Sequence, residues 1–207
     1  GAGKSSIISL MSRFYDIQKG EILIDEINIK DYNKYELRKK IGVVLQDVFL
    51  FTGNIKNNIR LDDNNISDEE VIEAAKYVNA DHFIKKLPQK YDELVMERGA
   101  TLSAGERQLL AFARALVFKP DVLILDEATS NIDTETEILI QDALKKLIKG
   151  RTTIAVAHRL STIQNSDKII VLHKGRIVEM GNHQELLQNE GMYYDLYRLQ
   201  YKESYQA

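Results

Sequence analysis

The fold class of this chain follows from one stretch, VLILDE at residues 122–127. Four apolar residues in a row after Pro120 are typical of a strand that is buried on both faces, as in a parallel sheet. Short β-rich runs and amphipathic helical patterns alternate on either side of this stretch. We therefore expect an α/β domain with a mostly parallel sheet flanked by helices.

Working outward, period-2 alternation and apolar runs predict further strands at residues 21–29 (with a turn at Asp25-Glu26), 41–45, 152–157, 168–172 and 176–179. Helices are expected over residues 5–14 and after four capping patterns, which are Ser67 with Glu70, Ser103 with Glu106, Thr134 with Glu137, and Asn182 with Glu185. The region of about residues 62–120 is rich in helix and has no strong strand. We expect it to be a helical subdomain inserted into the sheet domain.

The composition narrows the class of protein. With 207 residues, 44% of them hydrophobic and 29% charged, the chain has enough apolar mass for a folded core. A net charge of -3 argues against a dominant nucleic-acid surface, so no nucleic-acid partner is expected. The absence of cysteine excludes disulfides, thiol catalysis and cysteine-based zinc sites. No apolar run reaches the roughly 18–20 residues of a membrane helix.

The chain opens on GAGKS at residues 1–5, which matches the end of the phosphate-loop pattern G-x-x-x-x-G-K-[ST]. In such a loop the glycines let backbone N–H groups curl around phosphate, Lys4 reaches the β- and γ-phosphates, and the Ser5 hydroxyl binds Mg²⁺. The alternative is a glycine turn before an ordinary helix. The first glycine of the pattern would lie before Gly1, so we expect the chain to be a fragment that begins inside its own phosphate loop.

The carboxylate pair at the end of the central strand fits the same chemistry. Asp126 is expected to bind Mg²⁺ directly or through water, and Glu127 to polarise the attacking water as general base. Taken alone, the pair is also consistent with an Asp-Glu turn after a buried strand. The phosphate-loop pattern in the same chain favours the nucleotide site.

A family resemblance joins these features. The stretch LSAGE at residues 102–106 resembles the signature motif of ATP-binding cassette (ABC) proteins, whose consensus is LSGGQ. Gln46 then resembles the Q-loop glutamine, Asp133 the D-loop aspartate and His158 the switch histidine of that family. Singly, these three are also consistent with a surface glutamine, a helix N-cap and a structural histidine. Five motifs in the family's order extend the resemblance over essentially the whole chain and imply a P-loop NTPase-type fold.

The resemblance implies that two cassettes pack head to tail around two ATP molecules with Mg²⁺. Ser103 and Gly105 would cover the γ-phosphate of the partner's nucleotide, and Asp133 would line the interface. Glu127, His158 and Gln46 would be the catalytic residues, and Ser5, Gln46 and Asp126 the metal ligands. The residues that would contact the chain's own nucleotide also include Gly1, Ala2, Gly3, Lys4, Ser5 and Ser6.

A narrower resemblance points to the exporter branch of the family. The segments RFYD at residues 13–16, FLF at residues 49–51 after the Q-loop, and ERG at residues 97–99 are similar to exporter sequences, the last to their X-loop. This implies the motor domain of a multidrug or lipid half-transporter at the cytoplasmic face of the cell membrane. Its partners would be a second cassette, in a homo- or heterodimer, and the coupling helices of a membrane domain fused upstream.

Two alternatives and two departures accompany this interpretation. The alternatives are an importer-type ATPase with separate membrane subunits and a non-transport ABC ATPase. The latter shares the phosphate loop, signature and Asp-Glu pair but generally lacks the exporter X-loop. Ala104 stands where the signature usually has glycine, and Glu106 where it has glutamine. A carboxylate near a triphosphate is unfavourable, so we expect the half-site served by Ser103 to be weaker or tuned in a heterodimer.

Overall fold

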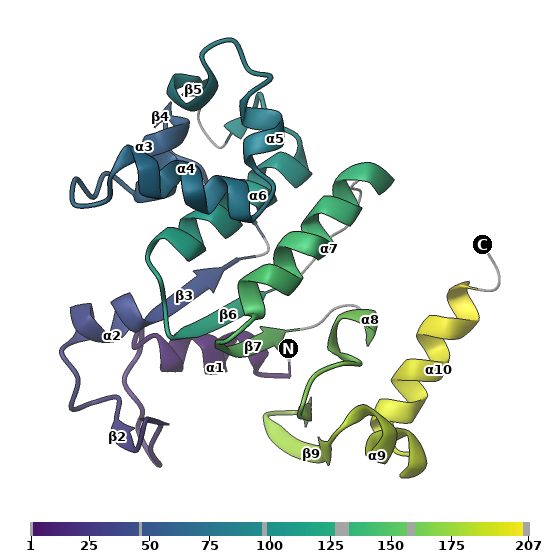
Figure 1. Ribbon diagram of the computed structural model, residues 1–207. Coiled ribbons are helices and arrows are strands. Elements are labelled where there is room, and N and C mark those ends of the chain that lie inside the picture. The colour runs from purple at the N-terminus through teal and green to yellow at the C-terminus, as the bar shows by residue number, and fades with distance from the viewer. Residues whose placement is uncertain (1, 46, 97–98, 127–132, 157–159, 205–207) are drawn as a thin grey trace. The chain divides into compact units, whose positions relative to one another are not determined.

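The computed structural model describes residues 2–45, 47–96, 99–126, 133–156 and 160–204 (Figure 1). It divides into two compact units. One unit combines Gly1–Tyr32 with Ala155–Ala207, and the other is Asn33–Ile154. Each unit is described by itself.

The second unit is built on a three-stranded sheet in the order β3-β6-β7. Its strands are β3 (Ile41–Val44), β6 (Val122–Asp126) and β7 (Thr152–Val156), the last of which begins in this unit. β3 and β6 run parallel, with Val43 opposite Ile124. The predicted parallel sheet and its fully apolar central strand are therefore confirmed, and Leu123 and Ile124 are completely buried.

A close approach fixes the start of this parallel pair. A Cβ atom added to Gly42 would lie 2.8 Å from Cγ of Pro120, so only glycine fits beside that ring. Next to it, the Asp121 amide donates to the Lys40 carbonyl over 3.0 Å, and the Lys40 ammonium contacts the Asp121 carboxylate at 2.9 Å. These contacts hold the two strands in register at the edge opposite Asp126.

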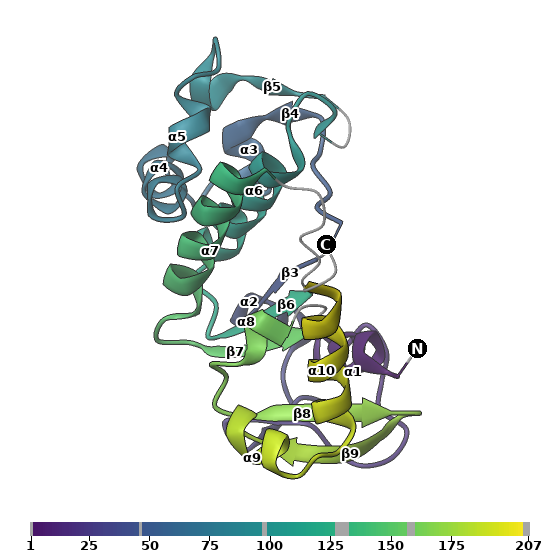
Figure 2. The ribbon, with the colours of Figure 1, turned by 90° about the vertical axis from the view of Figure 1, so that its right-hand side faces the viewer.

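Helices form most of the rest of this unit (Figures 1 and 2). Its elements besides the sheet are α2 (Lys34–Lys40), β4 (Gly53–Asn54), α3 (Ile55–Arg60), α4 (Asp68–Tyr77), α5 (Asp81–Ile84), the 3₁₀ turn η1 (Lys90–Asp92), β5 (Leu94–Val95), α6 (Ala104–Val117) and α7 (Thr134–Ile148). α6 packs against α3, α4, α7 and β3. It therefore connects α3, α4 and α7 to the sheet at β3.

An ionic network ties α3 to its neighbours. The Lys56 ammonium lies 2.9 Å from the Asp68 carboxylate at the start of α4 and 2.8 Å from that of Asp92 in η1, and Arg60 also pairs with Asp68. The guanidinium of Arg60, and then the ammonium of Lys56, lower the pKa of Asp68 below its usual value. Asp68 therefore supports folding above its normal pKa, and that support is lost as acid protonates it.

The first unit contains the start and the end of the chain. Its elements are α1 (Lys4–Met11), a hairpin of β1 (Leu23–Ile24) and β2 (Ile27–Asn28), α8 (Leu160–Ile163), a hairpin of β8 (Ile169–His173) and β9 (Arg176–Gly181), α9 (His183–Gln188) and α10 (Met192–Ser204). Ile169, Val171, Leu186 and Tyr193 form its buried cluster. The Tyr193 hydroxyl lies 2.7 Å from Nδ1 of His183, so this large polar side chain is satisfied where it is buried.

Most predicted element boundaries agree with the structure. The turn at Asp25-Glu26 is confirmed, because both residues have positive φ and join β1 to β2. The helix expected over residues 5–14 ends at Met11, since the chain turns at Arg13, where φ is 50°. The expected cap at Thr134 is wrong by one residue, because Asp133 is the N-cap and accepts from the Thr136 amide.

None of the helices in the described ranges combines the length and the apolar character needed to span a bilayer.

The burial of β6 predicts that shortening one of its side chains lowers the free energy of unfolding much more than shortening an exposed side chain does. Ile124→Ala should lower the free energy of unfolding by about 2–5 kcal/mol, because it leaves a cavity in a completely buried strand. Ile138→Ala is the matched control, since this α7 side chain is 65% exposed and should change stability by about 0.5 kcal/mol or less. Urea denaturation measures both, and equal losses would contradict the central position of β6.

Candidate functional site

The predicted phosphate loop leads directly into α1. Gly3 occupies the N-cap position with φ 97° and ψ 6°, a left-handed conformation that favours glycine, and no side chain caps the helix. The first N–H groups of a helix have no partner within it, so the amides at this end remain available to a ligand. The first turn carries no acidic residue, and the side chains of Lys4, Ser5 and Ser6 are exposed. This arrangement suits an anion such as phosphate.

A second contact holds the loop in place. The carbonyl of Ala2 accepts a 3.2 Å hydrogen bond from the Gly175 amide, in the turn that joins β8 to β9. Gly175 has φ 76°, and its neighbour Lys174 has φ 48°. The turn therefore fixes the residue before Gly3, and a change of the hairpin would shift the loop. Gly1 lies outside the described residues.

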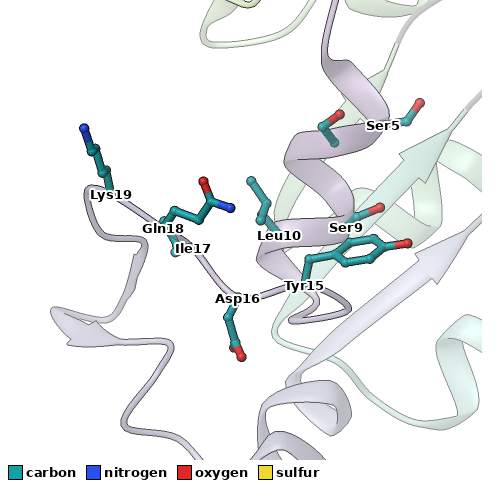
Figure 3. A pocket seen from close by; sticks show the side chains of 9 residues that line it. Ser5, Ser9, Leu10, Tyr15, Asp16, Ile17, Gln18 and Lys19 are labelled. Carbon is teal, nitrogen blue, oxygen red and sulfur yellow. The ribbon is translucent and has the colours of Figure 1, made fainter.

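An open hollow of about 610 Å³ lies along α1 (Figure 3). Ser5, Ser6, Ser9 and Leu10 of the helix form one wall, and residues 15–19 of the following segment form the other. Ser5 and Ser6 thus belong both to the predicted phosphate site and to this hollow. The remaining lining residues were not predicted as binding residues, although Tyr15 and Asp16 belong to the exporter-like segment RFYD.

Asp126 is the last residue of β6 and is half-buried. It lies at the carboxyl end of a parallel strand, the edge where ligands bind in open α/β sheets. In the described residues no three His, Asp or Glu side chains come together to hold a metal ion. Mg²⁺ does not need such a cluster, because one or two carboxylates together with water and substrate phosphate usually bind it. The Ser5 hydroxyl and the Asp126 carboxylate have the required chemistry.

Three of the predicted catalytic and metal residues lie outside the described residues: Gln46, Glu127 and His158. The phosphate loop belongs to the first unit and Asp126 to the second, so each is described within its own unit. The assignments for these residues remain predictions from the sequence.

The signature-like segment forms the start of α6. The Ser103 hydroxyl accepts from the Glu106 amide over 3.2 Å, and the Glu106 carboxylate accepts from the Ser103 amide over 2.8 Å. The predicted capping box is therefore confirmed. Ser103 is exposed and can still donate its hydroxyl proton to a ligand, whereas Gly105 is buried. Ala104 is exposed and lies in the first helical turn, where a methyl group is not strained.

Asp133 is exposed at the N-cap of α7, a helix that packs against α6. Its carboxylate accepts from the Thr136 amide over 2.9 Å, and hydrogen bonding to Thr136 lowers the pKa of Asp133. The side chain is thus ionised at neutral pH and fixed at a helix start. The structure establishes this capping role. The role of Asp133 at a dimer interface stays a prediction from the sequence.

The segment before the signature packs on the segment after the Q-loop. Gly99 has φ 67°, and an added Cβ would lie 2.8 Å from Cδ1 of Leu50 and 3.0 Å from Cδ of Arg107. The Arg107 guanidinium donates to the Leu102 carbonyl over 2.6 Å. The X-loop-like and Q-loop-like segments are therefore in contact through Leu50. Glu97 and Arg98 lie outside the described residues.

An apolar surface lies beside this contact. Phe49 is 47% exposed and Phe51 is 54% exposed, with their rings edge to face at a centroid distance of 5.0 Å, while Leu50 between them is buried. We call this exposed pair, Phe49 and Phe51, the aromatic patch. Leu94 of β5, which pairs with β4, and Met96 just after β5 are further exposed apolar side chains. Large apolar side chains left exposed in this way are candidates for docking.

Comparison with known proteins agrees with these motifs. The family model described as "ABC transporter" matches residues 1–130. The chain is 56% identical over 200 residues to a probable multidrug resistance ABC transporter ATP-binding/permease protein of Bacillus subtilis, covering 97% of this chain and 30% of that protein. It is 50% identical over 203 residues to an ATP-dependent lipid A-core flippase of Syntrophus aciditrophicus, covering 98% of this chain and 34% of that protein.

A solved structure is also similar. A bacterial Atm1-family ABC exporter with ATP bound superposes with a TM-score of 0.88 at 46% identity, over 96% of this chain and 35% of that chain. The chain therefore spans about a third of the length of these relatives.

The geometry at Gly3 yields a matched pair of variants. Gly3→Ala and Gly150→Ala each place a methyl group on left-handed backbone without a close clash, so each should lower stability by about 1–2 kcal/mol. Only Gly3→Ala should also weaken binding of inorganic triphosphate, by about tenfold, as the loop shifts to relieve the strain. Isothermal titration calorimetry measures the affinities, and equal affinities in the two variants would remove Gly3 from the anion site.

Proposed function

The chain belongs to the ABC transporter family, and from this premise we propose that it is the ATP-binding and ATP-hydrolysing motor domain of an exporter. The observation that carries the nucleotide site is the uncapped start of α1, where left-handed Gly3 leads into Lys4, Ser5 and Ser6. The exporter assignment is supported by the similarity of nearly the whole chain to proteins described as a multidrug transporter and a lipid A-core flippase.

In this proposal the chain's own residues bind and orient the triphosphate. The α1 amides and the Lys4 ammonium hold its phosphates, and Ser5, Gln46 and Asp126 provide oxygen ligands for Mg²⁺. When bound, Mg²⁺ neutralises charge that develops on the phosphate oxygens. Glu127 accepts a proton from the attacking water, and His158 orients that water at the γ-phosphate. Catalysis of this kind is mainly positioning and charge stabilisation.

Two cassettes would complete each site. The exposed Ser103 hydroxyl and the amides at the start of α6 are suited to cover the γ-phosphate of a nucleotide held by a partner cassette. Gly105 lies in the same turn, and Asp133 starts the helix packed beside it. A head-to-tail dimer, of identical or different cassettes, uses both surfaces.

The aromatic patch would dock the membrane domain. Relatives of this chain are described as ATP-binding/permease proteins, so the two functions occur in one polypeptide there. Coupling helices of a membrane domain are amphipathic partners that fit an exposed apolar surface. The motor would then work at the cytoplasmic face of the membrane and drive export of a drug-like or lipid-like substrate.

The general-base assignment can be tested in the full-length transporter. Glu127→Gln should keep ATP binding but lower turnover by about 10²- to 10⁴-fold at the site formed with Lys4 and Asp126, because the amide cannot accept the proton of water. Glu135→Gln removes a similar charge from an exposed position on α7 and should leave turnover unchanged. Phosphate release and nucleotide binding are measured separately, and near-normal turnover in Glu127→Gln would refute the assignment.

The proposed weakness of the Ser103 half-site can be tested by restoring the usual residue. Glu106→Gln keeps the capping box, since either side chain can accept from the Ser103 amide, but removes a negative charge near the triphosphate. ATP affinity or ATPase rate should rise by about fivefold, the effect of about 1 kcal/mol.

The control is Glu70→Gln, which makes the same change in the capping box of α4. It should alter neither quantity. If Glu106→Gln also leaves both unchanged, the carboxylate does not tune this half-site.

A further inference from the structure

A buried amide holds the loop that carries the aromatic patch. Asn58 of α3 is 3% exposed. Its Oδ1 accepts from the Phe51 amide over 2.8 Å, and its Nδ2 donates to the Phe51 carbonyl over 2.8 Å and to the Asn54 carbonyl over 3.2 Å. Both backbone polar groups of Phe51 are thus bonded to one side chain, as they would be to a neighbouring strand. Asn58 therefore fixes the backbone of the loop, while the Phe51 ring stays exposed.

A cation from α6 completes this arrangement. Nε of Arg114 donates to the Asn58 carbonyl over 2.8 Å, Nη1 donates to the Phe49 carbonyl over 3.0 Å, and Nη2 lies 3.4 Å from Oδ1 of Asn58. Burial lowers the pKa of the Arg114 guanidinium. Within the part of the chain that the structure describes, no carboxylate forms an ion pair with it. Its hydrogen bonds to the described residues all go to carbonyl-type oxygens.

These contacts connect the loop of Phe49 and Phe51 to α6, the helix that begins at the signature residues. α6 begins at the signature residues after Ser103 and reaches Arg114 about 16 Å further along its axis. α3 and α6 pack side by side (Figure 2). The Arg114 guanidinium is half-buried, so losing these acceptors would leave a partly desolvated charge without compensation. This cost favours movement of the loop together with α6.

We propose that Asn58 and Arg114 form a clamp that makes the aromatic patch move with the signature helix, so that ATP binding at the start of α6 is transmitted to the membrane-domain docking surface. Both are positioning residues, because neither needs to touch nucleotide or the membrane domain. The inference rests on the proposed function, in which Ser103 contacts a nucleotide held by the partner cassette. It adds the residues that carry the movement from that contact to Phe49 and Phe51.

The experiment measures backbone hydrogen exchange in the full-length transporter, without nucleotide and after trapping with Mg²⁺-ATP and orthovanadate. In the wild type, trapping should slow exchange in the signature segment, residues 99–106, and also in the loop, residues 48–54. In Arg114→Lys and in Asn58→Ala, the signature segment should still be protected. The ATP-induced slowing in the loop should shrink by about fivefold, the effect of losing one such hydrogen bond.

The difference between the two nucleotide states separates this role from a purely structural one. A clamp that only stabilised the fold would raise loop exchange equally with and without ATP. Arg114→Lys keeps the positive charge of this half-buried side chain and favours folding of the variant, while Asn58→Ala tests the same loop from the other helix. Lys119→Gln is the control, because it removes a cation just beyond α6 that pairs with Glu70 and not with the loop.

The exchange patterns of the loop and of residues 99–106 distinguish failure of the clamp from failure of the proposed function. Full loop protection in both clamp variants would overturn the inference. Wild-type protection of residues 99–106 without protection of the loop would also overturn it and leave the proposed function intact. No protection of residues 99–106 in the wild type would instead refute the proposed ATP contact of Ser103, and the inference with it.

Discussion

The burial of α6 is the constraint on which the second unit depends. Leu109, Leu110 and Ala113 are almost completely removed from solvent, and the helix contacts α3, α4, α7 and β3. Burial of apolar surface on this scale is the main favourable term in folding. One helix therefore sets the position of the signature residues at its start, the sheet beside it, and Arg114 near its end. These features therefore share one helix, and this is the structural basis of the proposed coupling between the signature residues and the aromatic patch.

The N-termini of α1 and α6 satisfy their first backbone N–H groups in different ways. The start of α6 is closed by its own capping box, so its side chains are fixed and the Ser103 hydroxyl proton remains for a ligand. The start of α1 has no side-chain cap, and left-handed Gly3 brings the backbone around it instead. In the proposed function, the α1 amides bind the chain's own triphosphate and the Ser103 hydroxyl contacts a nucleotide held by a partner.

Local patterns in the sequence predicted much of this accurately. The capping boxes at Ser67, Ser103 and Asn182, the turn at Asp25-Glu26 and the apolar strand before Asp126 all depend on residues within a few positions of one another. The clamp was not predicted, because Arg114 and the residues it binds are 56 and 65 positions apart. In the sequence, Arg114 looks like an ordinary polar position of an amphipathic helix and Asn58 like any polar helix residue. Their contact is formed only in the folded chain.

By itself the sequence determined the family, the alternation of strands and helices, and the types of residue available to hold phosphate and Mg²⁺. Each of these depends on residues a few positions apart, so short motifs are enough to identify it. Tertiary structure decided which polar groups are buried and paired. It placed the Phe51 backbone against Asn58, left the Phe49 and Phe51 rings in solvent, and satisfied the Arg114 charge with carbonyl oxygens. Desolvation is the physical reason, since the cost of burying a polar group depends on partners that only the folded chain supplies.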